Sequence, residues 1–81
     1  ANLLLKRATA YARLGEWRRS LADADAVLEL VPTSAAGFAI RGDSLLHQNQ
    51  FSAACTAFGD GLRHNPDDPV LTQGLHAAIS V

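Results

Sequence analysis

The chain has 81 residues, which is enough for one small domain. Hydrophobic residues make up 48 % of it and charged residues 19 %, a composition typical of folded proteins and too apolar for a disordered one. The net charge of −1 and the absence of an apolar run near ~20 residues argue against nucleic acid and membranes as partners.

The first third of the chain predicts two helices. Leu4, Ala8 and Tyr11 recur with the helical period, and Gly15 follows them as a break. The next apolar stripe has the same period and ends before Pro32, where helices usually stop. Its members are Trp17, Leu21, Ala24, Leu28 and Val31. We expect a helical hairpin in which Trp17 fills the space between the two helices.

The middle of the chain repeats this arrangement. Thr33 and Ser34 can cap a third helix, and Pro66 ends a fourth. The stripe of the third helix is Phe38, Gly42 and Leu45, and that of the fourth is Phe51, Cys55, Phe58 and Leu62. Gly59 and Gly61 lie inside the fourth helix, where we expect them to allow close packing on a neighbour rather than to form a hinge.

A fifth helix closes the chain. Asp68 followed by Pro69 is a strong start signal. The apolar stripe of this helix is Leu71, Leu75, Ala78 and Ile79, and its solvent-facing stripe is Thr72, Gln73, His76 and Ser80. No stretch alternates convincingly with period two, so we predict an all-α protein of five helices joined by short turns.

Residues 1–34 align with residues 35–68 without a gap. Ala8 falls on Gly42, Trp17 on Phe51, Ala24 on Phe58, Leu28 on Leu62 and Pro32 on Pro66. A helical hairpin of this length, with small, aromatic and proline positions in this order, resembles the tetratricopeptide repeat. The resemblance implies one tetratricopeptide domain over residues 1–81, built from repeats 1–34 and 35–68 and a capping helix 69–81, as a segment of a right-handed α-solenoid.

One residue departs from the pattern of the repeat family. Ser20 stands where the family usually has alanine, and we expect its hydroxyl to bond a carbonyl one turn earlier.

The sequence gives no case for catalysis, a cofactor or a metal. Asp43 and His47 share a helix face, but zinc needs three or four ligands. Asp23 and Asp25 lie in mid-helix without the glycine turn and glutamate of a calcium loop. The lone Cys55 excludes an internal disulfide and suits a reducing compartment, so we expect a cytoplasmic protein. We therefore expect no enzymatic activity.

The resemblance implies an inner groove lined by the first helix of each repeat, which would hold a peptide or protein partner. The helical wheel places a basic edge, Lys6 with Arg13, beside a small and apolar floor. The predicted groove residues are Asn2, Leu5, Lys6, Thr9, Arg13, Ala36, Ala39, Ile40, Asp43, Leu46, His47, Val70, Gln73 and Ala77. The alternative is a structural or oligomerisation segment without a peptide ligand of its own. Arg18 and Arg19 lie outside the groove as a solvated face or, alternatively, as a patch for phosphate or an acidic partner.

Within the repeat family, the chain is similar to the Hsp-organising co-chaperones. The similarity lies in LLLKRATAYARLGEW, GFAIRGDSLL and FGDGLRHNPDDPVLTQGL. It implies a heat-shock chaperone tail, Glu-Glu-Val-Asp, as a candidate partner held by a clamp of Asn, Lys and Arg. These would fall at Lys6, Ala36 and Ile40, so none of the three is kept. Aliphatic side chains cannot supply charge-assisted hydrogen bonds to a carboxylate, and we expect weak or absent binding of this tail.

The beginning of the chain carries Leu3, Leu4 and Leu5 in succession. Three consecutive residues span about 200° of a helical wheel, so the interior of one repeat cannot bury them all. The chain also begins with Ala1 rather than Met and holds fewer than the ~3 repeats usually needed for stability. We therefore expect a piece of a longer protein, in which an upstream helix covers this face. Self-association through this first helix is the alternative.

Overall fold

The structure, a computed structural model that describes residues 2–80, consists of α-helices and has no strand within that range. The helices are α1 (Asn2–Arg13), α2 (Trp17–Leu30), α3 (Ala35–His47), α4 (Phe51–His64) and α5 (Pro69–Ile79). The predicted all-α fold of five helices with tetratricopeptide-like repeats is confirmed. No helix in the described part is both long and apolar enough to cross a membrane.

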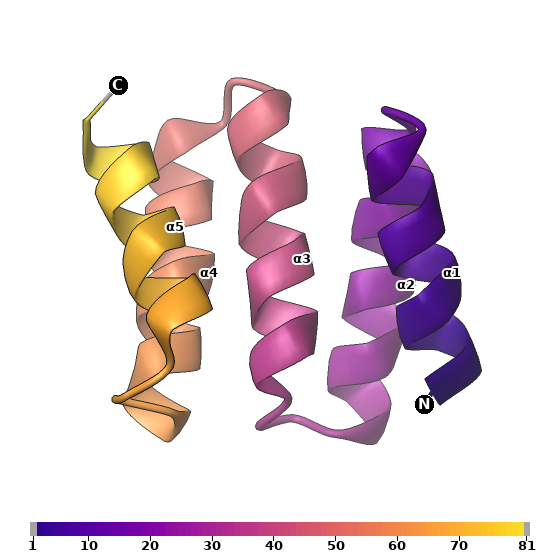
Figure 1. The fold of residues 1–81 in the computed structure, drawn as a ribbon, viewed down its shortest axis with the longest axis horizontal. Helices are drawn as coiled ribbons and strands as arrows, with labels where there is room; N and C mark the ends of the chain where they lie inside the picture. Colours follow the sequence, from indigo (N-terminus) through magenta and orange to yellow (C-terminus); the bar gives the residue numbers. More distant parts are fainter. Residues whose placement is uncertain (1, 81) are drawn as a thin grey trace.

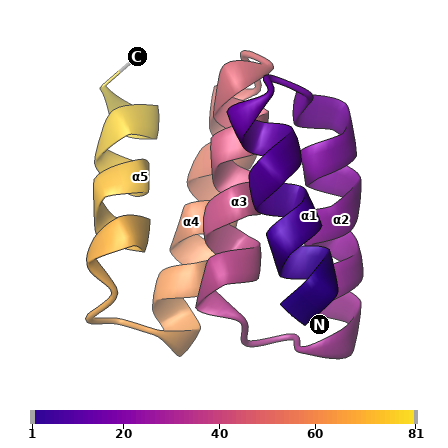
Figure 2. The same ribbon diagram turned by 45° about the vertical axis from the view of Figure 1, so that its right-hand side comes forward.

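The helices form a zigzag array in two layers. α2 packs on both α1 and α3, and α4 packs on both α3 and α5. α1, α3 and α5 also contact one another in sequence, so they form one layer, with α2 and α4 behind it (Figure 1). After a turn of the view, α3 still lies between α1 and α5 (Figure 2). One face of the molecule is therefore built by α1, α3 and α5 alone.

The backbone repeats with the spacing of the sequence. Gly15 turns α1 into α2 with a φ of 76°, and Asn49 turns α3 into α4 with a φ of 63°. Both values lie in the left-handed region, which glycine adopts freely and asparagine tolerates better than most residues. These two residues are 34 positions apart, as are the first residues of α2 and α4, Trp17 and Phe51. The two hairpins therefore share one backbone design.

Side-chain caps begin α3 and α5. The Ser34 hydroxyl accepts a hydrogen bond from the backbone N–H of Gly37 at 3.1 Å. The Asp68 carboxylate accepts bonds from the N–H groups of Val70 and Leu71 at 2.9 and 3.1 Å. These bonds satisfy amide groups that the first turn of a helix leaves without partners. The predicted caps at Ser34 and Asp68 are confirmed.

The apolar core gathers where α3, α4 and α5 meet. It contains Leu45, Ala54, Ala57, Phe58, Leu71 and Ala78. The Phe58 ring fits against Gly42 and Gly74, because a Cβ atom on either glycine would lie within 2.7 Å of ring carbons. The helices therefore approach one another closely around one aromatic ring.

Three predicted stripes are wrong at their ends, because Val31, Phe51 and Ile79 are all exposed. α2 buries Ser20, Asp23, Ala24 and Val27, whereas Val31 follows the helix and is exposed. Because α2 contacts both α1 and α3, the face that it buries is wider than the predicted apolar stripe and does not coincide with it. Ile79 is 67 % exposed, because α5 is not followed by a second helix among the described residues.

The positions of two side chains differ from the prediction. Trp17 was expected to pack within the first hairpin, and it reaches α3 instead. Its ring stacks on His47 of α3, with ring centroids 4.0 Å apart. The Ser20 hydroxyl donates to the carbonyl of Ala8 on α1 at 3.0 Å, instead of to its own helix. Both side chains join neighbouring helices, which spacing within one helix does not indicate.

The two glycines inside α4 have different surroundings. A Cβ atom on Gly61 would lie 2.8 Å from the Cβ of Phe38 and 2.9 Å from Cδ1 of Leu71. A Cβ atom on Gly59 would have no atom of another element within 4 Å. The expectation of close packing is confirmed for Gly61 and is wrong for Gly59.

This difference predicts opposite effects of one substitution. Gly59→Ala should raise the free energy of unfolding by about 0.5–1 kcal/mol, because alanine favours the helix and meets no obstacle. Gly61→Ala should lower it by about 1–3 kcal/mol, because the added methyl group overpacks the contact with Phe38 and Leu71. Urea unfolding of both variants measures this, and shifts of the same sign would contradict the packing described.

Candidate functional site

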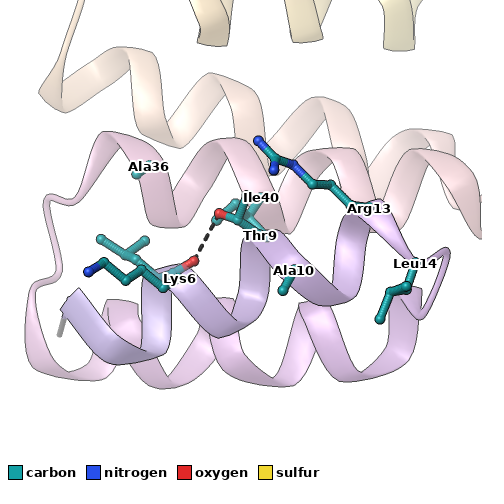
Figure 3. A pocket seen from close by; sticks show the side chains of 8 residues that line it. Lys6, Thr9, Ala10, Arg13, Leu14, Ala36 and Ile40 are labelled. Atoms are coloured by element: carbon teal, nitrogen blue, oxygen red, sulfur yellow. Dashed lines mark hydrogen bonds between the residues drawn. The ribbon is translucent and has the colours of Figure 1, made fainter.

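A first hollow lies between α1 and α3. It encloses about 610 Å³ and is lined mainly by apolar atoms (Figure 3). Its lining residues are Leu5, Lys6, Thr9, Ala10, Arg13, Leu14, Ala36 and Ile40. Lys6 and Arg13 lie at opposite ends of it in the figure. The Thr9 hydroxyl donates to the Leu5 carbonyl at 2.9 Å, so its hydrogen is already used.

A second hollow of about 510 Å³ continues from the first toward α5. Its lining residues are Thr9, Ala12, Arg13, Trp17, Ala39, Ile40, Asp43, Phe58, Val70, Gln73 and Gly74. Thr9, Arg13 and Ile40 line both hollows. The two hollows therefore form one continuous groove across α1, α3 and α5, hereafter the groove.

The structure brings most of the predicted groove residues together. Leu5, Lys6, Thr9, Arg13, Ala36, Ala39, Ile40, Asp43, Val70 and Gln73 all line the groove. Asn2, Leu46, His47 and Ala77 do not. His47 is instead stacked on Trp17, so that the indole, and not the imidazole, borders the groove.

Sequence reasoning missed several lining residues. Three of them come from α1 or directly follow it, namely Ala10, Ala12 and Leu14. The other three come from α2, α4 and α5, namely Trp17, Phe58 and Gly74. The two aromatic residues belonged to stripes that indicated core. Phe58 lies in the core and also lines the groove, whereas Trp17 is half-buried and lines the groove beside His47. Close packing at Gly74 could have been predicted, because a glycine inside a helix often marks a place where another element approaches the backbone closely.

The charges of the groove are unevenly distributed. Lys6 and Arg13 form no ion pair with any residue between 2 and 80. They are seven residues apart on α1, which corresponds to about 10 Å along the helix axis. Asp43 lies farther along, on α3, with its carboxylate 3.5 Å from Nδ1 of His47. The α1 side of the groove is therefore positive, and the α3–α5 side carries a carboxylate.

Polar contacts behind the groove hold α1 in place. The guanidinium of Arg7 donates to both carboxylate oxygens of Asp23 at 2.7 and 2.8 Å, and Asp23 is only 6 % exposed. These hydrogen bonds lower the pKa of the Asp23 carboxyl; burial opposes the shift, and the positive charge of Arg7 adds to it. Helical spacing does not indicate this pair, because its members are on different helices.

The same layer of polar contacts joins α2 to α3. The Ser44 hydroxyl donates to the Ser20 hydroxyl at 3.2 Å, and the Arg41 guanidinium pairs with the Asp25 carboxylate. Ser20 and Ser44 are both fully buried. α1, α2 and α3 are thus joined by directional bonds that set how far apart the walls of the groove stand.

The side chains that could ligate a metal are scattered over the described residues. Within residues 2–80, no three of the His, Cys, Asp and Glu side chains lie where they could hold a metal ion together. The Asp43–His47 pair stands apart from other such groups, and the Cys55 thiol is half-buried beside the core. The arrangement offers contact surface and charge, which are the means of binding.

The chain is similar to known proteins over nearly all of its length. It is 29 % identical over 79 residues to Hsp70-Hsp90 organizing protein 1 of Glycine max, which is 98 % of this chain and 14 % of that protein. It is 27 % identical over 79 residues to the Hsp70-Hsp90 organizing protein of Triticum aestivum, with the same coverage of 98 % and 14 %. It is 29 % identical over 73 residues to Hsp70-Hsp90 organizing protein 2 of Arabidopsis thaliana, with 90 % and 13 % covered.

These similarities indicate distant homology to one segment of each relative. The chain spans only 14 % of the length of the first two and 13 % of the third. No family model matches the chain.

The Arg7–Asp23 pair predicts a pH-dependent difference in stability. Asp23→Asn should lower the urea midpoint near pH 7, because Arg7 loses an ionised partner. The contribution of the pair is present above the ordinary carboxyl pKa of about 3.8 and is lost as the pH falls through the lower value in the folded chain. The wild type and Asp23→Asn should therefore converge below about pH 4.

The control for this experiment is Asp67→Asn. Asp67 is exposed and takes part in no ion pair within residues 2–80, so its variant should follow the wild type at every pH. A constant gap between the wild type and Asp23→Asn down to about pH 2 would contradict the role of the ionised carboxylate.

Proposed function

We propose that this chain is a non-catalytic protein-interaction module of the tetratricopeptide type, which binds an extended segment of a partner protein in the groove. The observation that carries the proposal is the continuity of the groove over three helices, with an apolar floor and two cations that no described residue neutralises. Distant homology to Hsp70-Hsp90 organizing proteins supports a role in protein interaction in general.

The size of the groove fits a short extended peptide. Packed helices lie about 8–10 Å apart, so three of them span roughly 20 Å. An extended chain rises about 3.3 Å per residue, and about six residues would cross the groove. Such a peptide would lose little entropy on binding compared with a long disordered segment.

The charges of the groove favour one ligand chemistry and one orientation. An acidic group would find Lys6 and Arg13 on the α1 side. An apolar side chain would bury itself against Ile40 between them. The far end, beside Asp43 and Gln73, would take neutral or basic groups. We therefore propose a cytoplasmic partner whose segment is acidic at one end and apolar in the middle.

The names of the relatives associate those proteins with Hsp70 and Hsp90. Ala36 and Ile40, which stand at the expected clamp positions for a chaperone tail, both line the groove but carry no charge. A carboxylate there would lose its hydration without gaining a charge-assisted hydrogen bond. We therefore propose that the natural ligand differs from the Glu-Glu-Val-Asp tail.

A second candidate role is a structural segment that continues a helical array or associates with itself. One observation favours it, namely that Leu3 at the outer end of the array is 82 % exposed. The two roles use different surfaces, so a variant of the groove and a variant of Leu3 distinguish them.

The groove proposal is tested on an array of peptides with free C-termini. The labelled protein should retain peptides that combine acidic and apolar residues. Arg13→Glu should abolish most of this signal, because it reverses the charge at the centre of the groove. The matched control is Arg18→Glu, an exposed arginine on α2 that does not line the groove, and it should keep the signal. Equal losses in both variants would contradict groove binding.

The missing clamp predicts a second result. Isothermal calorimetry with a Glu-Glu-Val-Asp peptide should give a dissociation constant weaker than ~10 μM, or about −7 kcal/mol. The double variant Ala36→Lys with Ile40→Arg should bind the peptide more tightly, because it restores two cations in the groove. Tight binding by the wild type would show that other residues hold the carboxylates.

A further inference from the structure

The two hollows of the groove are built from equivalent positions of the repeat, which lie 34 residues apart in the sequence. Five residues of α1 and α3 that line the first hollow have equivalents on α3 and α5 that line the second. The equivalent pairs are Leu5 with Ala39, Lys6 with Ile40, Thr9 with Asp43, Ala36 with Val70, and Ile40 with Gly74. Because the backbone design is shared, the differences within these pairs determine which side chain each hollow suits.

One difference gives the second hollow a flat floor on α5. Gly74 stands where Ile40 stands in the first hollow, and it carries no side chain that could project into the groove. A Cβ atom on Gly74 would lie 2.2 Å from Cε1 of Phe58, so the ring reaches α5 from the layer behind and takes up that place. Phe58 is only 2 % exposed and does not protrude. A large planar side chain can therefore lie against α5 at Gly74.

The second hollow also has an aromatic wall that the first lacks. Trp17 lines the second hollow and does not line the first. Its indole stacks on the ring of His47, with ring centroids 4.0 Å apart and planes inclined by 13°, and this stack holds the indole in one orientation. Aromatic rings attract one another beyond the effect of burying their surface. The wall therefore favours an aromatic side chain over an aliphatic one of similar size.

Another difference gives the second hollow a hydrogen-bond acceptor. The side chain of Asp43 is 48 % exposed, and its carboxylate pairs with no lysine or arginine between residues 2 and 80. Nδ1 of His47 lies 2.9 Å from the backbone carbonyl oxygen of Asp43 but 3.5 Å from the carboxylate, which exceeds the roughly 2.7–3.2 Å of an N–H···O hydrogen bond. The carboxylate can therefore accept a hydrogen bond from a ligand. Arg13 lines the same hollow and balances the charge of Asp43, so a neutral donor fits there better than a cation.

We propose that the second hollow is a subsite for one tyrosine side chain of the bound peptide. The ring of that tyrosine lies against α5 at Gly74, beside the indole of Trp17, and its hydroxyl donates to the Asp43 carboxylate. Phenylalanine would leave this acceptor to water, and lysine would place a second cation beside Arg13. The inference rests on the proposed function, since it names one side chain of the peptide whose acidic end is held on the α1 side of the groove.

The experiment titrates the 81-residue chain with single blocked amino acids and follows its NMR signals, so that the result does not depend on the rest of a peptide. N-acetyl-tyrosinamide should shift the amide signals of Asp43, Gln73 and Gly74, together with the indole N–H signal of Trp17, the one tryptophan of the chain. It should bind about fivefold more tightly than N-acetyl-phenylalaninamide, which lacks the hydroxyl. N-acetyl-leucinamide and N-acetyl-lysinamide should bind more weakly than either aromatic compound.

Asp43→Leu should remove the fivefold preference for tyrosine, because the acceptor is lost while the aromatic surfaces remain. The matched control is Asp67→Leu, which changes an exposed aspartate that does not line the groove, and it should keep the preference. The comparison of tyrosine with phenylalanine in the wild type tests the same hydrogen bond without any change to the protein.

Equal affinities of the wild type for the tyrosine and phenylalanine compounds would overturn the proposal. Tighter binding of N-acetyl-lysinamide would also overturn it, because the hollow would then be a cation subsite, as would shifts confined to Leu5 and Lys6 of the first hollow. Array peptides that bind equally well when their tyrosine is replaced by alanine would overturn the subsite and leave the groove proposal standing. Binding of N-acetyl-tyrosinamide at Asp43, with no peptide retained on the array, would support the subsite and contradict the groove proposal.

Discussion

Phe58 lies between glycines of two other helices, Gly42 of α3 and Gly74 of α5. A Cβ atom on Gly42 would stand 2.6 Å from Cζ of the ring, and one on Gly74 would stand 2.2 Å from Cε1. Neither distance leaves room for a methyl group, so the close approach of these helices requires glycine at both positions. One ring therefore fixes how α3, α4 and α5 pack, and the same ring forms part of the floor of the groove.

The first hairpin has the same backbone but different chemistry. Ala24 and Ala8 stand at the positions of Phe58 and Gly42, and both are fully buried. Small residues at both positions bring the helices together without a large apolar side chain between them. In place of an aromatic side chain, polar contacts stabilise the first hairpin. They are the Arg7–Asp23 ion pair and the hydrogen bond from the Ser20 hydroxyl to the Ala8 carbonyl. The α1 end should therefore respond to pH, while the α5 end depends on packing.

Much of this structure follows from periodicity. The helical period, the caps at Ser34 and Asp68 and the repeat of 34 residues predict five helices and the layer that faces the groove. A helical wheel assigns a residue to a face, and this was enough to place Lys6, Arg13 and Ile40 in the groove. Helices, their caps and their faces depend on local backbone geometry, so the spacing of residues along the sequence is enough to predict them.

Contacts between helices were predicted less well. Spacing on α2 does not indicate that Trp17 reaches His47 on α3, or that Asp23 meets Arg7 on α1. Both depend on how two helices cross and how far apart they lie. Gly59 and Gly61 show the same limit, since they are two residues apart in one helix and only Gly61 has a close neighbour. Whether a glycine is needed depends on the partner surface, which the repeat pattern leaves open.

The groove depends on both kinds of contact, because its wall on α1 is held by polar bonds and its floor near α5 by the ring of Phe58. Amide chemical shifts measured by NMR during titration with an acidic, apolar peptide chosen from the array test its role most directly. We expect shifts at Lys6, Arg13, Ile40 and Gln73, and none at Arg18 on α2 or Ser52 on α4. Shifts confined to α2 and α4, with α1, α3 and α5 unchanged, would contradict it.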